Sequence, residues 1–181
     1  MLSRINLRRN AAMLANVSRM FATDNQKMHT QLFHYHKDKL DAKMIDFHGY
    51  EMPVTYGGEQ GGVLKEHLWT RENCGIFDVS HMGQLHVRGK DAAKYLEFLT
   101  VVDTQALAPG QATLSLLMNE MGGIKDDCII TKVSDEHFYV VLNAGCKEKD
   151  LKHMRNHLNR RKFPDCALQY QSETIRSLIA V

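Results

Sequence analysis

Three strand-like segments follow one another in the middle of the sequence, and connections of nine and four residues join them. Residues 113–118, 128–133 and 138–142 are rich in apolar side chains, and Gly122-Gly123 and the polar run 134–137 separate them. Two glycines permit the positive φ angles of a tight turn, and connections this short join antiparallel strands. The sequence therefore predicts an antiparallel hairpin arrangement, and the wholly apolar segment 138–142 is expected to be buried.

Helices with one apolar face are expected to cover this sheet. Apolar residues recur at helical spacing after Asp91, which is a plausible helix cap, and again within 147–160. A further helix is expected near 63–73 and further strands near 84–88 and 175–181, the last of them buried. This order of elements predicts an α+β fold, with an antiparallel or mixed sheet and helices packed on one side of it. The residues expected to face inward are Val63, Leu64, Leu68, Ala92, Leu96, Leu99, Leu151, Met154 and Leu158.

The composition excludes several classes of protein. Hydrophobic residues make up 44% of the chain and charged residues 24%, which is ordinary for a globular domain. The sequence has no run of about eighteen apolar residues, so no membrane span is predicted. It has no basic stripe interleaved with aromatic residues, so nucleic-acid binding is not predicted. The four cysteines form no CxxC pair and His34-x-His36 has no third ligand nearby, so no metal site is expected.

The first 23 residues differ from the rest in charge. They hold Arg4, Arg8, Arg9 and Arg19 and no acid, so the net charge of +2 combines +4 in this segment with −2 in the remainder. A helical wheel places most of the arginines opposite an apolar side, which is typical of a mitochondrial transit peptide. A basic tail without a targeting role is the alternative. Residues 1–23 are therefore interpreted as a transit peptide, which implies the mitochondrial matrix.

The strongest chemical motif is Asp126-Asp127, which follows the Gly-Gly turn at the start of an apolar strand. Strand alternation directs the two carboxylates to opposite faces of the sheet. One of them is then directed inward, where a carboxylate is costly unless it is paired or functional. Such a group could hold an amine or accept a proton from an attacking nitrogen. The alternative is an Asx-type turn with both acids in water.

Asn143 lies between a predicted strand and the helix within 147–160. Its side chain could cap that helix. Its amide could equally read the hydrogen-bonding edge of a ligand. The residues alone leave both roles open.

Four segments together resemble the aminomethyltransferase, or T-protein, family of the glycine cleavage system. The resemblance extends from about residue 30 to 181, and Phe77-Asp78-Val79-Ser80-His81-Met82 followed by Gly122-Gly123-x-x-Asp126-Asp127 is its most specific part. The matching segments are 43–54, Arg71 with 75–82, 119–127, and 143–146 with 149–151.

The resemblance implies a reaction. Family members move the methylene of a lipoyl-bound aminomethyl group, carried by the partner H-protein, to tetrahydrofolate and release ammonia. It implies a catalytic role at the pterin for Asp127. It also implies a folate site formed by Met82, Leu114, Tyr139, Val141 and Asn143.

The resemblance also implies that residues 24–181 are the N-terminal part of a larger, three-domain folate-binding fold. We therefore expect a portion of a longer aminomethyltransferase, because the sequence stops within a predicted buried strand. The alternatives are a non-catalytic folate-binding relative of the iron–sulfur assembly type, a module of a sarcosine or dimethylglycine dehydrogenase, and a truncated product without activity.

Overall fold

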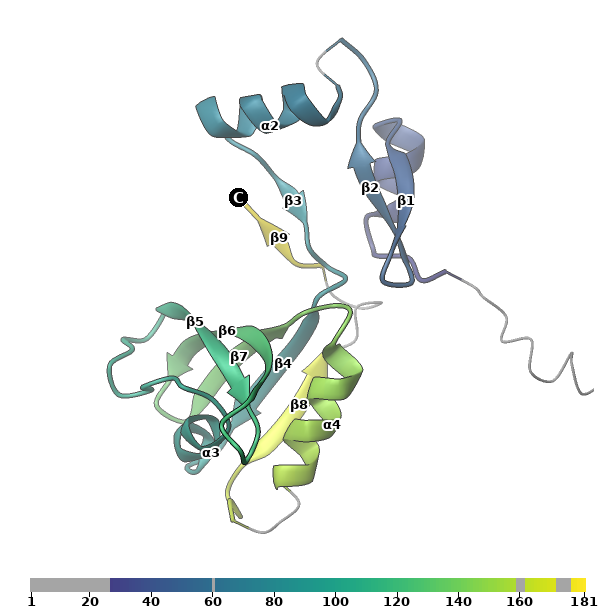
Figure 1. Ribbon diagram of the computed structural model, residues 1–181. Coiled ribbons are helices and arrows are strands. Elements are labelled where there is room, and N and C mark those ends of the chain that lie inside the picture. The colour runs from purple at the N-terminus through teal and green to yellow at the C-terminus, as the bar shows by residue number, and fades with distance from the viewer. Residues whose placement is uncertain (1–26, 60, 159–161, 172–176) are drawn as a thin grey trace, which may run out of the picture.

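A five-stranded sheet with the strand order β5-β6-β7-β4-β8 forms the centre of the structure (Figure 1). The computed structural model describes residues 27–59, 61–158, 162–171 and 177–181. Each neighbouring pair of strands in this sheet is antiparallel, as the short connections predict. The strands are β4 (Gly83–Arg88), β5 (Ala112–Met118), β6 (Ile124–Ser134), β7 (His137–Leu142) and β8 (Ala167–Gln171).

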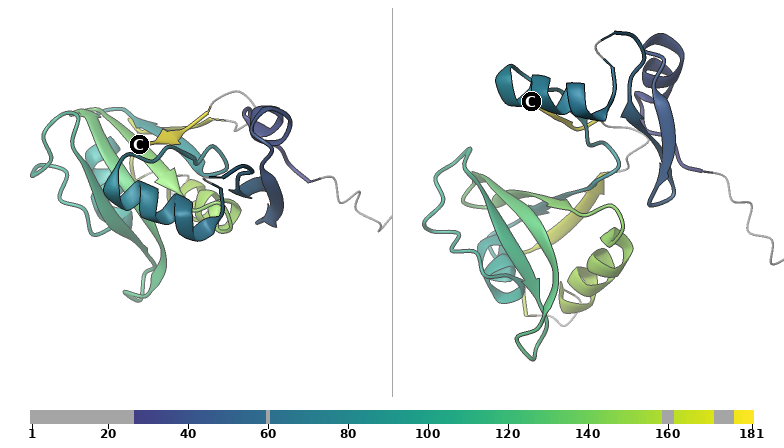
Figure 2. Two further views of the ribbon diagram at one scale, coloured as in Figure 1. Left: turned by 90° about the horizontal axis from the view of Figure 1, so that it is seen from above. Right: turned by 45° about the horizontal axis from the view of Figure 1, so that its top comes forward.

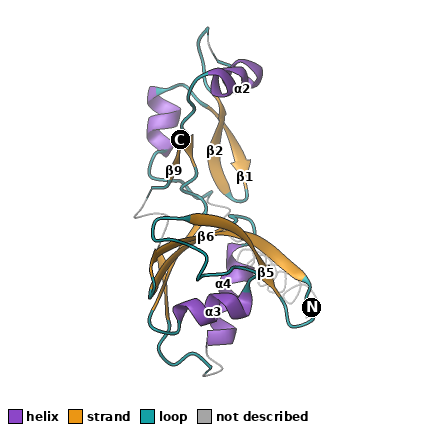
Figure 3. Ribbon diagram, turned by 90° about the vertical axis from the view of Figure 1, so that its left-hand side faces the viewer, coloured by secondary structure: helices purple, strands orange, loops and turns teal. Residues whose placement is uncertain are grey.

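Two helices, α3 (Ala92–Leu99) and α4 (Lys147–Leu158), pack on the same face of this sheet (Figure 3). Alternate strand residues are directed toward them, because successive side chains of a strand point to opposite faces. The α+β fold with helices on one side of the sheet is confirmed. The most deeply buried members of this core are Leu85, Val87, Ala92, Tyr95, Leu96, Leu117, Ile130, Phe138, Val140, Leu142 and Met154.

Asn119 closes the turn between β5 and β6. Its Oδ1 accepts hydrogen bonds from the backbone N–H groups of Met121 and Gly123, both at 2.9 Å. Gly122 has a φ of 77°, which an L-residue with a side chain rarely adopts. The turn fixes the register of the hairpin and thereby places Asp127 opposite Leu116.

A second group of elements lies beyond one end of the sheet (Figure 2). A hairpin of two strands turns at His48-Gly49, where both residues have positive φ angles of 51° and 83°. A helix follows this hairpin, and a pair of short antiparallel strands links it to the sheet. These elements are η1 (Tyr35–Lys39, a π-helix), β1 (Lys43–Phe47), β2 (Tyr50–Thr55), α2 (Val63–Glu72), β3 (Phe77–Asp78) and β9 (Ile179–Ala180).

Four strands do not follow from the sequence pattern, namely β1, β2, β3 and β8. Residues 46–53, with Gly49 and Pro53 among them, are typical of turns, yet they contain much of the β1–β2 hairpin. β1 is largely exposed, so it lacks the alternation of apolar residues that identifies a half-buried strand. β8 was not predicted because its apolar residues are mixed with glutamines, yet Leu168 and Tyr170 pack against the core.

Three burial expectations are wrong. Val63, Leu64 and Leu68 of α2 are 65%, 70% and 48% exposed, and α2 contains no buried residue. Ile179 of the expected buried strand is 41% exposed. In β7 only alternate residues are buried, so this apolar strand has one face on the core and one face away from it.

Asp91 precedes α3 but does not cap it. Its carboxylate instead accepts a hydrogen bond of 3.0 Å from the backbone N–H of Asp165, which precedes β8. The side chain therefore joins two segments that are distant in sequence.

Leu96 and Leu64 offer a matched test of which helix contributes to the core. Leu96 is fully buried and Leu64 is 70% exposed. We expect Leu96→Ala to lower the free energy of unfolding by about 2–5 kcal/mol, the usual cost of a cavity in a core. Leu64→Ala should change it by less than about 0.5 kcal/mol. Urea unfolding of both variants would check this, and equal losses would contradict the assignment of the core to α3.

Candidate functional site

The face of the five-stranded sheet opposite α3 and α4, here called the open face, carries a row of apolar side chains. Leu114, Ile129 and Val141 lie side by side on β5, β6 and β7, because Leu114 pairs with Ile129 and Ile129 pairs with Val141. Leu114 is 63% exposed. An apolar row on a flat sheet face is a suitable surface for a planar, partly apolar ligand.

Tyr139 extends this row toward β4. Its hydroxyl donates a hydrogen bond of 2.8 Å to Gln84 Oε1, and its ring centroid lies 5.3 Å from that of His86. The next polar contact joins His86 Nδ1 and His137 Nε2 at 2.8 Å. Burial lowers the pKa of His137, and Arg88 lowers it further, so a neutral ring can take part in this bond. The hydrogen bonds hold the rings in place beside the apolar row.

Asp127 lies near the start of β6, at one end of the open face, and is exposed. This end of the face, where β6 begins and β7 finishes, is called its edge below. The next core-facing residue, Cys128, is buried, so alternation directs Asp126 toward the α4 side of the sheet. The two carboxylates therefore diverge as strand geometry predicts. The acid directed inward is Asp126 and not Asp127, because the hairpin register places Cys128 and Ile130 in the core.

Asn143 joins the two acids. Its Nδ2 group donates to Asp127 Oδ1 at 2.7 Å and to Asp126 Oδ1 at 3.2 Å. α4 begins only at Lys147, so the amide serves the carboxylates and does not cap the helix. The orientation of Asp127 thus depends on a side chain from the end of the neighbouring strand.

The structure brings the six predicted site residues to one region. Leu114, Asp127, Tyr139 and Val141 lie on the open face, and Asn143 follows β7 at its edge. Met82 directly precedes β4, where Gly83 pairs with Leu142, so it lies next to the same edge. This geometry agrees with a common site without identifying its ligand.

Asp150, which the sequence interpretation passed over, lies behind this edge. The first turn of α4 carries it, and its side chain is fully buried. Burial raises the pKa of Asp150 to about 7, and the neighbouring Asp126 contributes to the shift. Its position four residues before Met154, on the core face of α4, is the signal that could have identified it.

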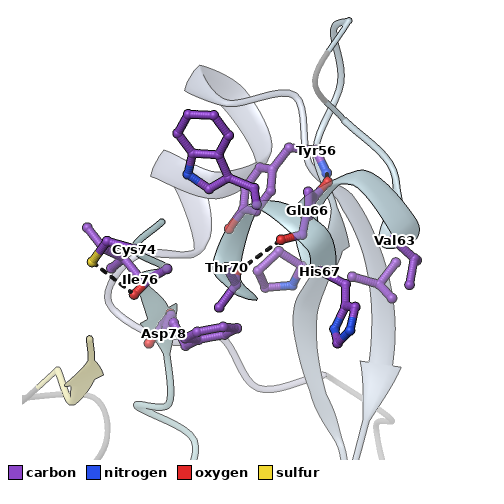
Figure 4. A pocket seen from close by; sticks show the side chains of 13 residues that line it. Tyr56, Val63, Glu66, His67, Thr70, Cys74, Ile76 and Asp78 are labelled. Carbon is purple, nitrogen blue, oxygen red and sulfur yellow. Dashed lines mark hydrogen bonds between the residues drawn. The ribbon is translucent and has the colours of Figure 1, made fainter. Parts of the chain in front are cut away.

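A cavity of about 630 Å³ lies between α2, β2 and β3 (Figure 4). Its walls are mainly apolar, with Trp69 and Phe77 among them, and none of the six predicted site residues lines it. Asp78 lies at its base. Burial raises the pKa of this carboxyl, but hydrogen bonds from Ser80, Thr30 and His36 outweigh burial and leave the pKa below its usual range. Asp78 therefore has the environment of a structural carboxylate.

A model of the GCVT N-terminal domain matches residues 33–180, which is most of the chain. The chain belongs to the aminomethyltransferase family of the glycine cleavage system. The mitochondrial aminomethyltransferases of Dictyostelium discoideum and Pisum sativum are 48% and 40% identical to it over 80% and 90% of its length. The family resemblance of the sequence motifs is thereby confirmed.

A solved structure places the chain in the same fold. The crystal structure of glycine cleavage system aminomethyltransferase T from Bartonella henselae superposes with a TM-score of 0.71 at 37% identity, over 80% of this chain and 38% of that one. The two mitochondrial relatives are covered over 34% and 39% of their length. This family member thus spans well under half the length of those proteins.

Two features are absent from the described part of the chain. No helix there is long and apolar enough to cross a membrane. Within the same residues, no three His, Cys, Asp or Glu side chains are grouped so as to hold a metal ion.

The pH dependence of stability tests whether Asp78 stabilises the fold of this family member. We expect Asp78→Asn to lower the free energy of unfolding at pH 7 by about 2–4 kcal/mol, because charged hydrogen bonds are lost. A lowered pKa means that the stabilising contribution is present above the ordinary value near 3.8 and is lost as pH falls below it. The difference from the unmodified chain should therefore shrink at pH 3. Thermal unfolding at both pH values would measure it, with the exposed Asp135→Asn as control.

Proposed function

We propose that this chain is the folate-binding portion of an aminomethyltransferase of the glycine cleavage system. The proposed reaction moves the methylene of a lipoyl-bound aminomethyl group on H-protein to tetrahydrofolate. Two folate nitrogens bond to the methylene carbon while its bonds to sulfur and to the amine break. The two nitrogens lose one proton each, the sulfur takes one as a thiol, and ammonia leaves with the other. No oxidant or reductant is needed.

The observation that carries this proposal is the position of Asp127 at the edge of an apolar, partly exposed sheet face. Leu114, Ile129 and Val141 offer a flat surface to the faces of a pterin ring, and Tyr139 adjoins them. Asp127 and Asn143 supply an acceptor and an amide at one end of that surface. This combination of an apolar surface with a carboxylate and an amide at one end fits tetrahydrofolate. As co-substrate, tetrahydrofolate supplies the nitrogens that receive the methylene.

Asp127 is proposed to accept a proton from an attacking folate nitrogen and to pass it on. A carboxylate at hydrogen-bond distance also stabilises positive charge that develops on that nitrogen. Asn143 fixes one oxygen of Asp127, so the other oxygen is available for a ligand. Asp126, turned away from the open face, is assigned no direct contact with the folate.

Asp127→Asn tests the catalytic assignment. The transfer assay supplies aminomethylated H-protein and tetrahydrofolate and measures methylenetetrahydrofolate and ammonia. If the unmodified chain turns over, we expect Asp127→Asn to reduce the rate by 10²-fold or more and to leave the unfolding midpoint unchanged. Asp135→Asn, another exposed acid, should keep full activity.

The same assay, with calorimetric titration of tetrahydrofolate, separates the alternatives. A chain that binds tetrahydrofolate without transfer would support the non-catalytic folate-binding alternative. Retained turnover in Asp127→Asn would overturn the catalytic role of this residue. Absence of both binding and turnover in the unmodified chain would contradict the proposed function.

We also propose that residues 1–23 direct the chain to the mitochondrial matrix and that residues 24–181 form the N-terminal part of the folate-binding domain. The targeting segment lies outside the described residues. The relatives from Dictyostelium discoideum and Pisum sativum are named as mitochondrial proteins, which supports this location.

A reporter fused to residues 1–23 should be imported by isolated mitochondria and become protected from protease. Replacing Arg8 and Arg9 by glutamate should reduce import at least fivefold, because transit peptides are rich in arginine and poor in acids. Replacing both by lysine is the matched control and should preserve import. Equal import of the glutamate and lysine fusions would contradict the proposal.

A further inference from the structure

Asp150 is a buried carboxyl group that the proposed reaction does not use. Its side chain is fully buried in the first turn of α4. Among the residues that the structure describes, no backbone or side-chain donor forms a hydrogen bond to either carboxyl oxygen, the acid discussed next excepted. Lys149 Nζ is 3.8 Å from Asp150 Oδ1 and instead donates a bond of 2.7 Å to the carbonyl of Lys125. A charged carboxylate in this position would be strongly disfavoured.

The group that faces Asp150 is a second carboxyl, that of Asp126. The two side chains are within hydrogen-bonding reach of each other. Asp126 Oδ2 and both oxygens of Asp150 are buried, and no donor group of the described residues bonds to any of the three. Cys146 is a further hydrogen-bond partner of Asp126. Two carboxyl oxygens in this arrangement can form a hydrogen bond only if they share a proton. One of the two acids must therefore be neutral.

The remaining contacts decide which acid carries the proton. Asp126 Oδ1 accepts hydrogen bonds from the backbone N–H of Asp127 at 3.0 Å and from Asn143 Nδ2 at 3.2 Å. Bonds from N–H donors stabilise the ionised form of a carboxyl, and Asp150 has no comparable donors. The neutral acid is therefore Asp150, and its O–H donates to Asp126.

We propose that Asp150 is a positioning residue for Asp127. As a neutral acid, Asp150 orients Asp126, and Asp126 acts through Asn143 on the Asp127 carboxylate on the open face. The chain of contacts is continuous, since Asn143 Nδ2 bonds to both Asp126 Oδ1 and Asp127 Oδ1. Loss of the proton would place two negative charges against each other, one of them fully buried, and displace Asp126. The consequence for folate rests on the proposed function, but the arrangement of the four side chains does not.

Asp126 has the largest effect of any neighbouring charged group on Asp150, followed by Lys149 and Lys125. Several titratable groups lie nearby. From β6 these are Lys125, Asp126 and Cys128, from the residue before α4 Cys146, and from α4 itself Lys149 and His153. Burial lowers the pKa of His153. Burial raises the pKa of Cys128 to about 12, and the hydrogen bond with Asp126 raises that of Cys146, so both thiols remain neutral. Asp126 has a lowered pKa despite its partial burial, and Lys149 a raised one. Asp150, with a pKa raised to about 7 by burial, changes charge between pH 6 and 8.5.

Nuclear magnetic resonance of the Asn143 side-chain amide tests the arrangement directly. In the full 181-residue chain we expect these resonances to shift with a midpoint near pH 7, and their assignment would come from an Asn143→Ser chain. In Asp150→Asn, whose amide can still donate to Asp126 but cannot ionise, the shift should be absent. Resonances that do not titrate in the unmodified chain, or that titrate equally in Asp150→Asn, would overturn the proposal.

Calorimetric titration of tetrahydrofolate tests the effect on the ligand. Between pH 6 and 8.5 the affinity of the unmodified chain should fall on the order of 30-fold, since about 3% of a group with a pKa of about 7 remains neutral at the higher pH. Asp150→Asn should bind equally at both pH values, and Asp150→Ala, which lacks the donor, should bind weakly at both. An unchanged affinity in Asp150→Ala would overturn the positioning role. If no form binds tetrahydrofolate, the proposed function fails and the Asn143 titration still decides the role of Asp150.

Discussion

Burial of one face of the antiparallel sheet is the constraint on which the rest of the structure depends. α3 and α4 cover one side, so most strand residues directed to that side are apolar. The opposite side is free of this demand and carries Leu114, Tyr139 and Val141 partly exposed. Because the side-chain period is two, the register that buries Cys128 also fixes Asp127 on the open face. The packing of the core thus positions the candidate catalytic group.

The edge between the two faces is where the polar groups gather. Asp126 is directed to the core side and Asp127 to the open side, and Asn143 bridges them from the end of β7. Behind them, Asp150 comes from a helix whose other core residues, Leu151 and Met154, are apolar. A buried acid at this point is costly by itself, and the contact with Asp126 offsets that cost only while one proton is shared. The core and the site are therefore coupled through a single titratable pair.

Sequence reasoning succeeded where one physical rule acts alone. The three central strands and α3 follow from periodicity and turn chemistry, and the divergence of Asp126 and Asp127 follows from strand alternation. It failed where tertiary partners decide. Leu64 of α2 has an apolar pattern without a partner in the described structure, and β1 is a strand because β2 pairs with it and not because of its own residues. The specific roles of Asp127 and of the folate-site residues came from the family resemblance and not from periodicity.

The contacts of Asn143 show why a local motif could not reveal the site. By sequence the residue is placed to cap α4, and a cap is the common use of such a side chain. In the fold, β6 and β7 pair so that the start of β6 meets the end of β7, and two carboxylates then lie within hydrogen-bond distance of the amide. A cap would use Oδ1 of Asn143 as an acceptor for backbone N–H groups, whereas here its Nδ2 donates to two charged acceptors, and hydrogen bonds of that kind are strong. The pairing of the strands, and not the identity of the neighbouring residues, thus determines that Asn143 serves Asp127.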